Sequence, residues 1–337
     1  MSSPAPIYSI SISAQAILDM HSLNNEGGEG NQIQTRMVNI IDAHGRLHNV
    51  NAVSGDMFKH IQAEHLHRLA VEAHLPLSEG ARLFNANRVN FDIDAQGELF
   101  EILESAEGDS AELDIILQRC AVTDLEGILV TAGKRSLPRK SVVEFGWVLG
   151  LPENVQTDSY FHVKYATDRS EIARTESESE SSREANVGQA IFHRPSSSGV
   201  YAVILNLESA RVGFNDISQQ YAIDKPSRTA RLRILLESVL YTFVEPSGAM
   251  RSTQNPHIVN LSGALAISHA VVPAPCISPL KPNFADEIKR IADAFSQLRP
   301  GAVEVQTFNS MSEFSEIMTP LIKNAIPYTL EVSNGKT

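Results

Sequence analysis

The segment from Ser54 to His60 contains residue types that can bind phosphate. An extended apolar stretch ends there and an apolar-periodic run begins, which predicts a helix that starts at this point. Ser54 or Asp56 can cap such a helix, and Gly55 allows another backbone to come close. The unpaired N–H groups of a first helical turn attract phosphate, and Lys59 and His60 follow one turn along. The Asp56 carboxylate competes for the same positive end, so the spacing also fits a capped helix that binds nothing.

Histidine is the second residue type that suggests a chemical role, because seven of the eleven histidines lie in the first 74 residues. His60, Glu64 and His67 share one face of the expected helix, as the ligands of a metal site would. The chain has no HExxH motif, and no second carboxylate or thiol stands nearby at ligand spacing. The row therefore favours histidines that face solvent or a binding partner, and no bound metal.

Positive charge is concentrated in two parts of the sequence. Residues 134–140 include four cations and no acid, and these candidate nucleic-acid contacts are Lys134, Arg135, Arg139 and Lys140. Arg228, Arg231 and Arg233 crowd the start of a long expected helix, and a glycine-containing segment at 247–252 follows its end. Taken alone, the arginines indicate surface charge and the segment indicates a helix C-cap.

No catalytic or cofactor motif is present. A GxSxG elbow is absent, and Cys120 and Cys276 have neither CxxC spacing nor a histidine close by in the sequence. The glycines at 27–30 match neither a P-loop nor a dinucleotide fingerprint. The residues thus predict no enzyme and no cofactor, and the cysteine usage favours a reducing cytoplasm. No apolar run is long enough to indicate secretion or membrane insertion.

The net charge of −12 argues against a nucleic-acid-binding surface that covers the whole protein. The charge is uneven, because eleven acidic residues and one basic residue, Arg119, lie between Asp92 and Glu126. The rest of the chain is close to neutral. A basic groove can therefore exist beside an acidic outer face.

The spacing of apolar residues predicts an α+β fold. The expected strands lie at about 7–18, 128–130, 200–207 and 258–267, and the expected helices at about 56–73, 110–120, 232–243, 284–298 and 314–321. Residues 76–155 are less regular, and residues 156–197 contain a polar run at 175–182 that indicates a long excursion of two strands. This order fits a ferredoxin-like or RRM-like sheet with large insertions, and also other α+β folds.

The residues Ala52, Val53, Ser54 and Gly55, leading into a helix with a basic residue and a histidine, resemble the signature of a known family. This family comprises the CRISPR-associated backbone subunits of type I Cascade complexes, the DevR-type branch of the RAMP superfamily. The resemblance implies a single RRM-like (ferredoxin-like) palm over residues 1–337. Residues 76–155 would be a finger or helical insertion, and residues 156–197 a thumb-like excursion.

The resemblance also implies a non-catalytic cytoplasmic protein that oligomerises along a CRISPR guide RNA and presents the guide for pairing with target DNA. Its partners would be the guide RNA, target DNA through the guide, further copies of itself and other Cascade subunits, with no membrane. The residues expected at the RNA are Asn24, Asn25, Arg36, Ser54, Gly55, Lys59, His60, Gly248, Met250, Arg251 and Ser252. Lys59 stands where relatives often have arginine, which implies a point-charge contact. Phe161 or Phe192, flanking the thumb, would wedge between bases.

Two other functions remain open at this point. A RAMP-type endoribonuclease that processes CRISPR repeat RNA would use one of the N-terminal histidines as a general base. A metal-dependent hydrolase would instead use the histidine row that includes His60 and His67.

Overall fold

The computed structural model describes residues 5–24, 27–29, 32–165, 189–248 and 255–331. Its strands are β1 (Ser9–His21), β2 (Gly28–Glu29), β3 (Gln32–Ile33), β4 (Met37–Ile41), β5 (Leu47–Val53), β6 (Ile128–Val130), β7 (Leu137–Arg139), β8 (Val143–Phe145), β9 (Val148–Tyr165), β10 (Gln189–Leu207), β11 (Phe214–Asn215), β12 (Gln220–Tyr221), β13 (His257–Ser268) and β14 (Val303–Phe308). Its helices are α1 (Gly55–Glu72), α2 (Glu79–Arg82), α3 (Val89–Asp94), α4 (Glu98–Glu104), α5 (Asp109–Arg119), α6 (Ala121–Glu126), α7 (Lys225–Val244), α8 (Phe284–Leu298) and α9 (Met311–Asn324). The α+β class is confirmed, and each expected helix and strand has a counterpart.

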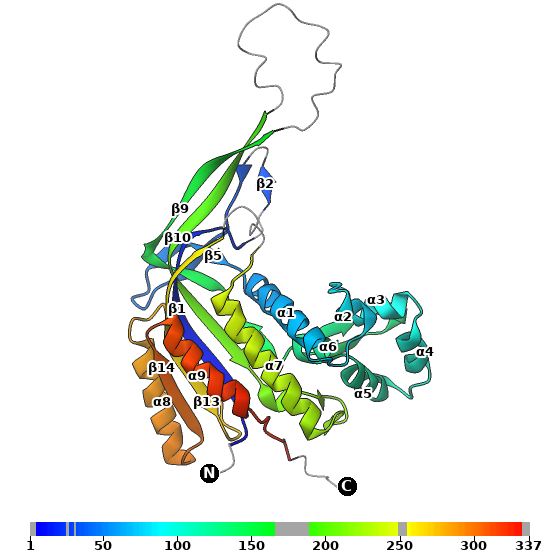
Figure 1. Cartoon of the computed structure of the whole chain (residues 1–337). Helices are drawn as coiled ribbons and strands as arrows, with labels where there is room; N and C mark the ends of the chain where they lie inside the picture. Colours follow the sequence, from blue (N-terminus) through cyan, green and yellow to red (C-terminus); the bar gives the residue numbers. More distant parts are fainter. Residues whose placement is uncertain (1–4, 25–26, 30–31, 166–188, 249–254, 332–337) are drawn as a thin grey trace, which may run out of the picture.

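One large sheet organises the molecule, with the strand order β14-β13-β1-β10-β9-β5-β4 and antiparallel pairing along this path. β1 and β10 lie at its centre, where Ile12 pairs with Leu205. Helices α1, α7 and α9 pack on one face and α8 packs on the other (Figure 1). On β13, Leu265 joins the core on the first side and Ala264 packs against α8 on the second. The alternation of side chains along one strand thus serves two helix layers.

The polar face of β1 is covered as well. The alternating pattern predicted a half-buried strand, but Ser11 and Ser13 are both buried. The Ser11 hydroxyl donates to the Pro275 carbonyl at 2.6 Å, and the Gln15 amide donates to the Pro279 carbonyl at 2.9 Å. These side chains satisfy carbonyl groups of a connecting segment that would otherwise lack donors, which explains why a polar row occurs at a buried position.

Strands β9 and β10 form a long pair that runs beyond the rest of the sheet (Figure 1). Their pairing continues from the sheet out to Tyr165 and Gln189. The expected two strands are therefore present, although each is the continuation of a sheet strand rather than a separate element. The polar run at 175–182 lies outside the described residues.

The elements α2 to α6, with β6 and β7, form what we call the helical lobe. It has its own hydrophobic core, to which Leu113, Ile116 and Leu117 contribute. The lobe lies beside the sheet rather than on it (Figure 1). No helix in the described parts of the chain is both long and apolar enough to cross a membrane.

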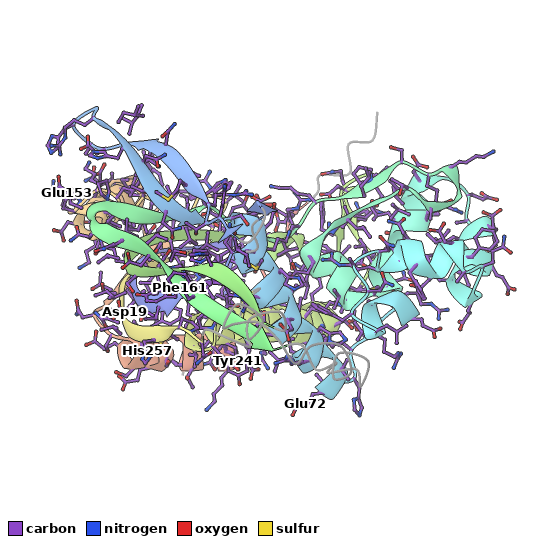
Figure 2. All side chains as sticks on the ribbon, turned by 90° about the horizontal axis from the view of Figure 1, so that it is seen from above. Asp19, Glu72, Glu153, Phe161, Tyr241 and His257 are labelled. Carbon is purple, nitrogen blue, oxygen red and sulfur yellow. The ribbon has the colours of Figure 1, made fainter. Side chains whose placement is uncertain are left out.

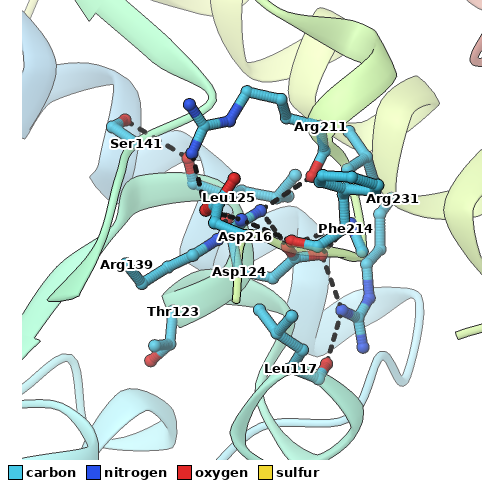
Figure 3. Close-up of polar contacts among 12 residues, drawn as sticks. Leu117, Thr123, Asp124, Leu125, Arg139, Ser141, Arg211, Phe214, Asp216 and Arg231 are labelled. Carbon is cyan, nitrogen blue, oxygen red and sulfur yellow. Dashed lines mark hydrogen bonds and ion pairs between the residues drawn. The ribbon is translucent and has the colours of Figure 1, made fainter. Parts of the chain in front are cut away.

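A buried ion network joins the helical lobe to α7 (Figure 3). The fully buried Asp124 carboxylate accepts from Arg139 at 2.7 Å and from Arg231 at 2.8 Å. Arg228 is also buried, and its guanidinium carbon lies 3.6 Å from the centre of the Tyr221 ring. The interpretation of Arg228 and Arg231 as surface charge is therefore wrong, since both hold internal contacts.

Candidate nucleic-acid interface

The start of α1 has the geometry that its sequence predicted. Ser54 is extended, and its hydroxyl accepts from the Met57 amide at 3.2 Å as an N-cap. The Ser54 amide in turn donates to the Asn24 side-chain oxygen at 3.2 Å. The next two amides, on Gly55 and Asp56, have no acceptor among the residues that the structure describes. The first turn therefore keeps donors for an anionic group.

Gly55 is required by packing within the protein. A Cβ atom at this position would lie 2.5 Å from the Phe145 carbonyl oxygen and 3.1 Å from the Gly146 carbonyl oxygen. The connection between β8 and β9 thus lies directly against the start of α1. The sequence correctly indicated a close backbone approach, and the approaching backbone belongs to the same chain.

Lys59 points toward the helical lobe. It is half-buried, and its Nζ donates to the Glu126 backbone carbonyl at 3.1 Å. Burial lowers the pKa of Lys59, and burial raises the pKa of the neighbouring Glu126 carboxyl, which the nearby Lys59 charge partly offsets. A cavity of about 250 Å³ between α1 and the lobe is lined by Lys59, His60, Arg88 and Glu126 among others. His60 is exposed, with its ring 5.6 Å from the Phe84 ring.

Two segments that are distant in sequence meet beside this helix start. A Cβ atom on Gly248 would clash with the backbone of Leu23, so the segment after α7 lies against the segment after β1. Leu23 precedes Asn24, which is bonded to Ser54. The structure thereby brings Asn24, Ser54 and Gly248 to one place. Asn25, Met250, Arg251 and Ser252 lie outside the described residues.

Arg36 and Trp147 complete this surface. Trp147 is 42 % exposed, and the Arg36 guanidinium carbon lies 5.5 Å from the centre of its ring. Trp147 comes immediately before Val148, which pairs with Val53, so it lies beside Ser54. The sequence analysis missed Trp147. Two signals pointed to it: it is the only tryptophan in the chain, and it follows a glycine.

The basic loop at 134–140 does not form a free cationic patch. Arg139 is fully buried in the Asp124 network, so its assignment as a nucleic-acid contact is wrong. Arg135 pairs with Glu112 at 2.8 Å and with Glu104 at 2.9 Å, and Lys140 pairs with Glu208 at 3.3 Å. Lys134 is exposed. Acidic side chains from elsewhere in the chain thus neutralise most of this loop.

On the β9–β10 pair, the Phe161 side chain is 70 % exposed and its ring centre lies 4.4 Å from that of His193 (Figure 2). The backbone of Phe192 pairs with that of His162, and the Phe192 side chain lies outside the described part of the chain. An exposed aromatic ring on an extended strand pair is available to a partner.

The histidines of α1 have separate partners. His65 is buried, with Nε2 at 3.0 Å from the Glu245 carbonyl oxygen, and His67 Nε2 lies 2.9 Å from the Arg82 carbonyl oxygen. Glu64 pairs with Arg68 instead of either ring. Within the described ranges, no group of three or more His, Cys, Asp or Glu side chains could hold a metal ion.

Comparison with known proteins gives one family match. The family model described as CRISPR-associated negative auto-regulator DevR/Csa2 matches residues 12–289. No curated protein matches the chain. Among solved structures, it is similar to a chain of a CRISPR RNA-guided surveillance complex in a pre-nicking state, with 15 % identity, 88 % of this chain and 89 % of that chain covered, and a TM-score of 0.46.

Two further solved structures show the same kind of similarity. A chain of another CRISPR RNA-guided surveillance complex has 12 % identity, covers 88 % of each chain and gives a TM-score of 0.41. Csc2 from Thermofilum pendens has 12 % identity, with 95 % of this chain and 87 % of that chain covered, and a TM-score of 0.39.

Proposed function

The chain belongs to the CRISPR-associated DevR/Csa2 family, and from that premise we propose that it is a non-catalytic backbone subunit that oligomerises along a CRISPR guide RNA. It would hold the ribose-phosphate chain and present the bases for pairing with target DNA in a Cascade-type complex. The protein then contributes shape and charge, and the guide contributes the sequence.

The observation that carries this proposal is the meeting of three segments at the start of α1. Asn24 follows β1, Ser54 caps α1, and Gly248 follows α7. Two open backbone amides and neutral side chains at this place suit phosphate and sugar contacts, which position a strand without reading its bases. The Lys59 amino group donates to the Glu126 carbonyl of the lobe, so in this proposal its positive charge acts on the RNA from a partly buried position.

The distribution of charge supports RNA binding by an acidic protein. The acidic stretch from Asp92 to Glu126 builds α3 to α6, and these helices lie to one side of the sheet (Figure 2). The start of α1 meets the sheet at β5, β8 and β9. The greatest negative charge is thus displaced toward the lobe, which reduces its repulsion of a strand bound along the sheet.

In this proposal the main sheet with α1 and α7 is an RRM-like palm, the region 76–155 is the finger insertion, and the outer parts of β9 and β10 are the thumb. Phe161, exposed on the thumb, would reach the neighbouring copy and wedge between bases. Each copy needs only a few contacts, because binding strengthens through neighbours along one strand.

Sedimentation of the protein expressed with and without a guide RNA tests the proposal. We expect a monomer alone and a ribonucleoprotein of several copies with the guide. Replacing both Asn24 and Arg36 by alanine should weaken assembly. Arg290→Ala on α8, an exposed cation away from the site, is the matched control and should assemble normally. Identical monomeric profiles with and without RNA would refute the proposal.

A further inference from the structure

Trp147 is a partly exposed aromatic residue whose backbone lies next to the start of α1. It lies between β8 and β9, and its side chain is 42 % exposed although tryptophan is the largest apolar side chain. Both of its chain neighbours are fixed: the Gly146 carbonyl lies against Gly55, and Val148 pairs with Val53. The backbone at Trp147 is therefore fixed beside Ser54, and the side chain keeps open surface.

Arg36 is also held in position by its backbone. The Arg36 carbonyl accepts from the Ala52 amide at 3.0 Å and from the Asn51 side-chain amide at 3.2 Å. Its guanidinium carbon lies 5.5 Å from the centre of the Trp147 ring, within the range of a cation–π contact. A positive charge and an exposed aromatic surface thus stand together where the chain enters β4 and β9.

We propose that Trp147 and Arg36 form a stacking platform for one nucleobase of a single-stranded RNA. The base would stack on the exposed part of the indole, and the guanidinium would pair with a phosphate of the same strand. This inference rests on the proposed function and adds to it a base-contacting site on the palm. Stacking accepts any base, which suits a guide of variable sequence.

The surroundings favour RNA over a protein partner at this site. The backbone on either side of Trp147 lies against the start of α1, where the Gly55 and Asp56 amides are open, so phosphate donors and an aromatic residue occur on neighbouring segments. A protein interface would be expected to cover a wider apolar area and to exclude charge from its centre. Here a guanidinium lies 5.5 Å from the ring centre.

The presence of a single tryptophan makes the test direct, because emission excited at wavelengths that the seven tyrosines do not absorb reports on Trp147 alone. A single-stranded guide RNA carrying a terminal dye is titrated, and its anisotropy measures binding independently of the tryptophan. We expect the tryptophan emission to be quenched in proportion to the RNA bound. Trp147→Leu should weaken binding about tenfold, the size of one lost base stack, and Trp147→Phe should weaken it less.

Leu298→Ala is the matched control, because Leu298 is an exposed apolar side chain on α8 and its loss should not change RNA affinity. RNA binding that leaves the emission unchanged would overturn the platform and leave the proposed function intact. If the tryptophan emission changes with protein concentration in the absence of RNA, a second copy of the protein covers the ring, and the platform proposal is wrong. An anisotropy that never rises would overturn both proposals, and the wild-type measurements need no variant to fold.

Discussion

The sequence predicts nucleic-acid contacts both in the loop at 134–140, which belongs largely to the helical lobe, and at the start of α1. In the structure the two regions differ in whether their polar groups already have partners within the protein. The loop at 134–140 has four cations, but Arg139 is buried on Asp124 and Arg135 is paired with two glutamates. The start of α1 has fewer charges, yet it keeps two open amides and has an exposed tryptophan beside it. The density of charge along the chain is thus a poor guide to binding, because long-range partners decide which charges remain available.

The two regions also differ in what holds them in place. The helical lobe depends on a buried ion network. Removing one partner from such a network leaves an uncompensated buried charge, which destabilises the folded state. The start of α1 depends on close backbone packing at Gly55 and Gly248 and on neutral hydrogen bonds such as Ser54 to Asn24. Substitutions can therefore separate stability of the lobe from binding at the site.

The largest effect is expected at Asp124. Asp124→Ala leaves the buried guanidinium groups of Arg139 and Arg231 without their carboxylate, which should destabilise the protein by about 3 to 5 kcal/mol. Chemical denaturation at neutral pH measures this change. Asp216→Ala is the control, because its side chain is 35 % exposed and solvent can replace it. If both variants unfold at the same denaturant concentration, the lobe is not held by this network.

His21, beneath the site, should make stability depend on pH. It is buried, and burial lowers its pKa from 6.5 to about 4. Below pH 6.5 the His21 side chain is protonated in the unfolded chain, but in the folded chain it stays neutral until about pH 4. The free energy of unfolding therefore falls by about 3 kcal/mol as the pH is lowered over this interval. His21→Leu should remove that part of the dependence in denaturation curves at pH 7 and pH 5. An equal loss in the variant would assign the effect to other groups.

Gly55→Ala tests the packing at the start of α1. Its Cβ would lie 2.5 Å from the Phe145 carbonyl oxygen, so the β8–β9 connection must move, at a cost of about 1 to 3 kcal/mol. Gly27→Ala is the control, because nothing lies within 4 Å of its added Cβ. We expect a lower melting temperature for the first variant only. A melting temperature like that of the wild type would show that the two segments are not tightly packed.

Much of the fold could be predicted from local patterns. The strand at 9–21, the Ser54 cap and the helices at 225–244 and 284–298 each follow from the spacing of apolar residues and from one or two capping residues. These signals lie within a single element, so no tertiary information is needed. The same reasoning could identify Ser54 as the start of the candidate site.

The remaining features depend on residues far apart in the sequence. Arg139 and Arg231 share a carboxylate on α6, and no local sequence pattern predicts that pairing. Gly248 meets Leu23 more than two hundred residues away, and Trp147 lies beside Ser54 only because β5 pairs with β9. Local spacing cannot distinguish an exposed cation from a buried one, since both occur at polar positions of similar elements.

The smallest expected effect compares one cation from each region. Arg36→Ala should lower the slope of log affinity against log salt by about 0.7, the value for one phosphate contact on a single strand. Lys140→Ala, which removes a cation already paired with Glu208, should leave the slope and the affinity unchanged. RNA titrations at several salt concentrations measure both slopes. A slope that Arg36→Ala leaves unchanged would contradict a phosphate contact at Arg36, and a lower slope for Lys140→Ala would mean that the lobe loop contacts RNA as well, because only a cation that displaces counterions from the strand changes the salt dependence.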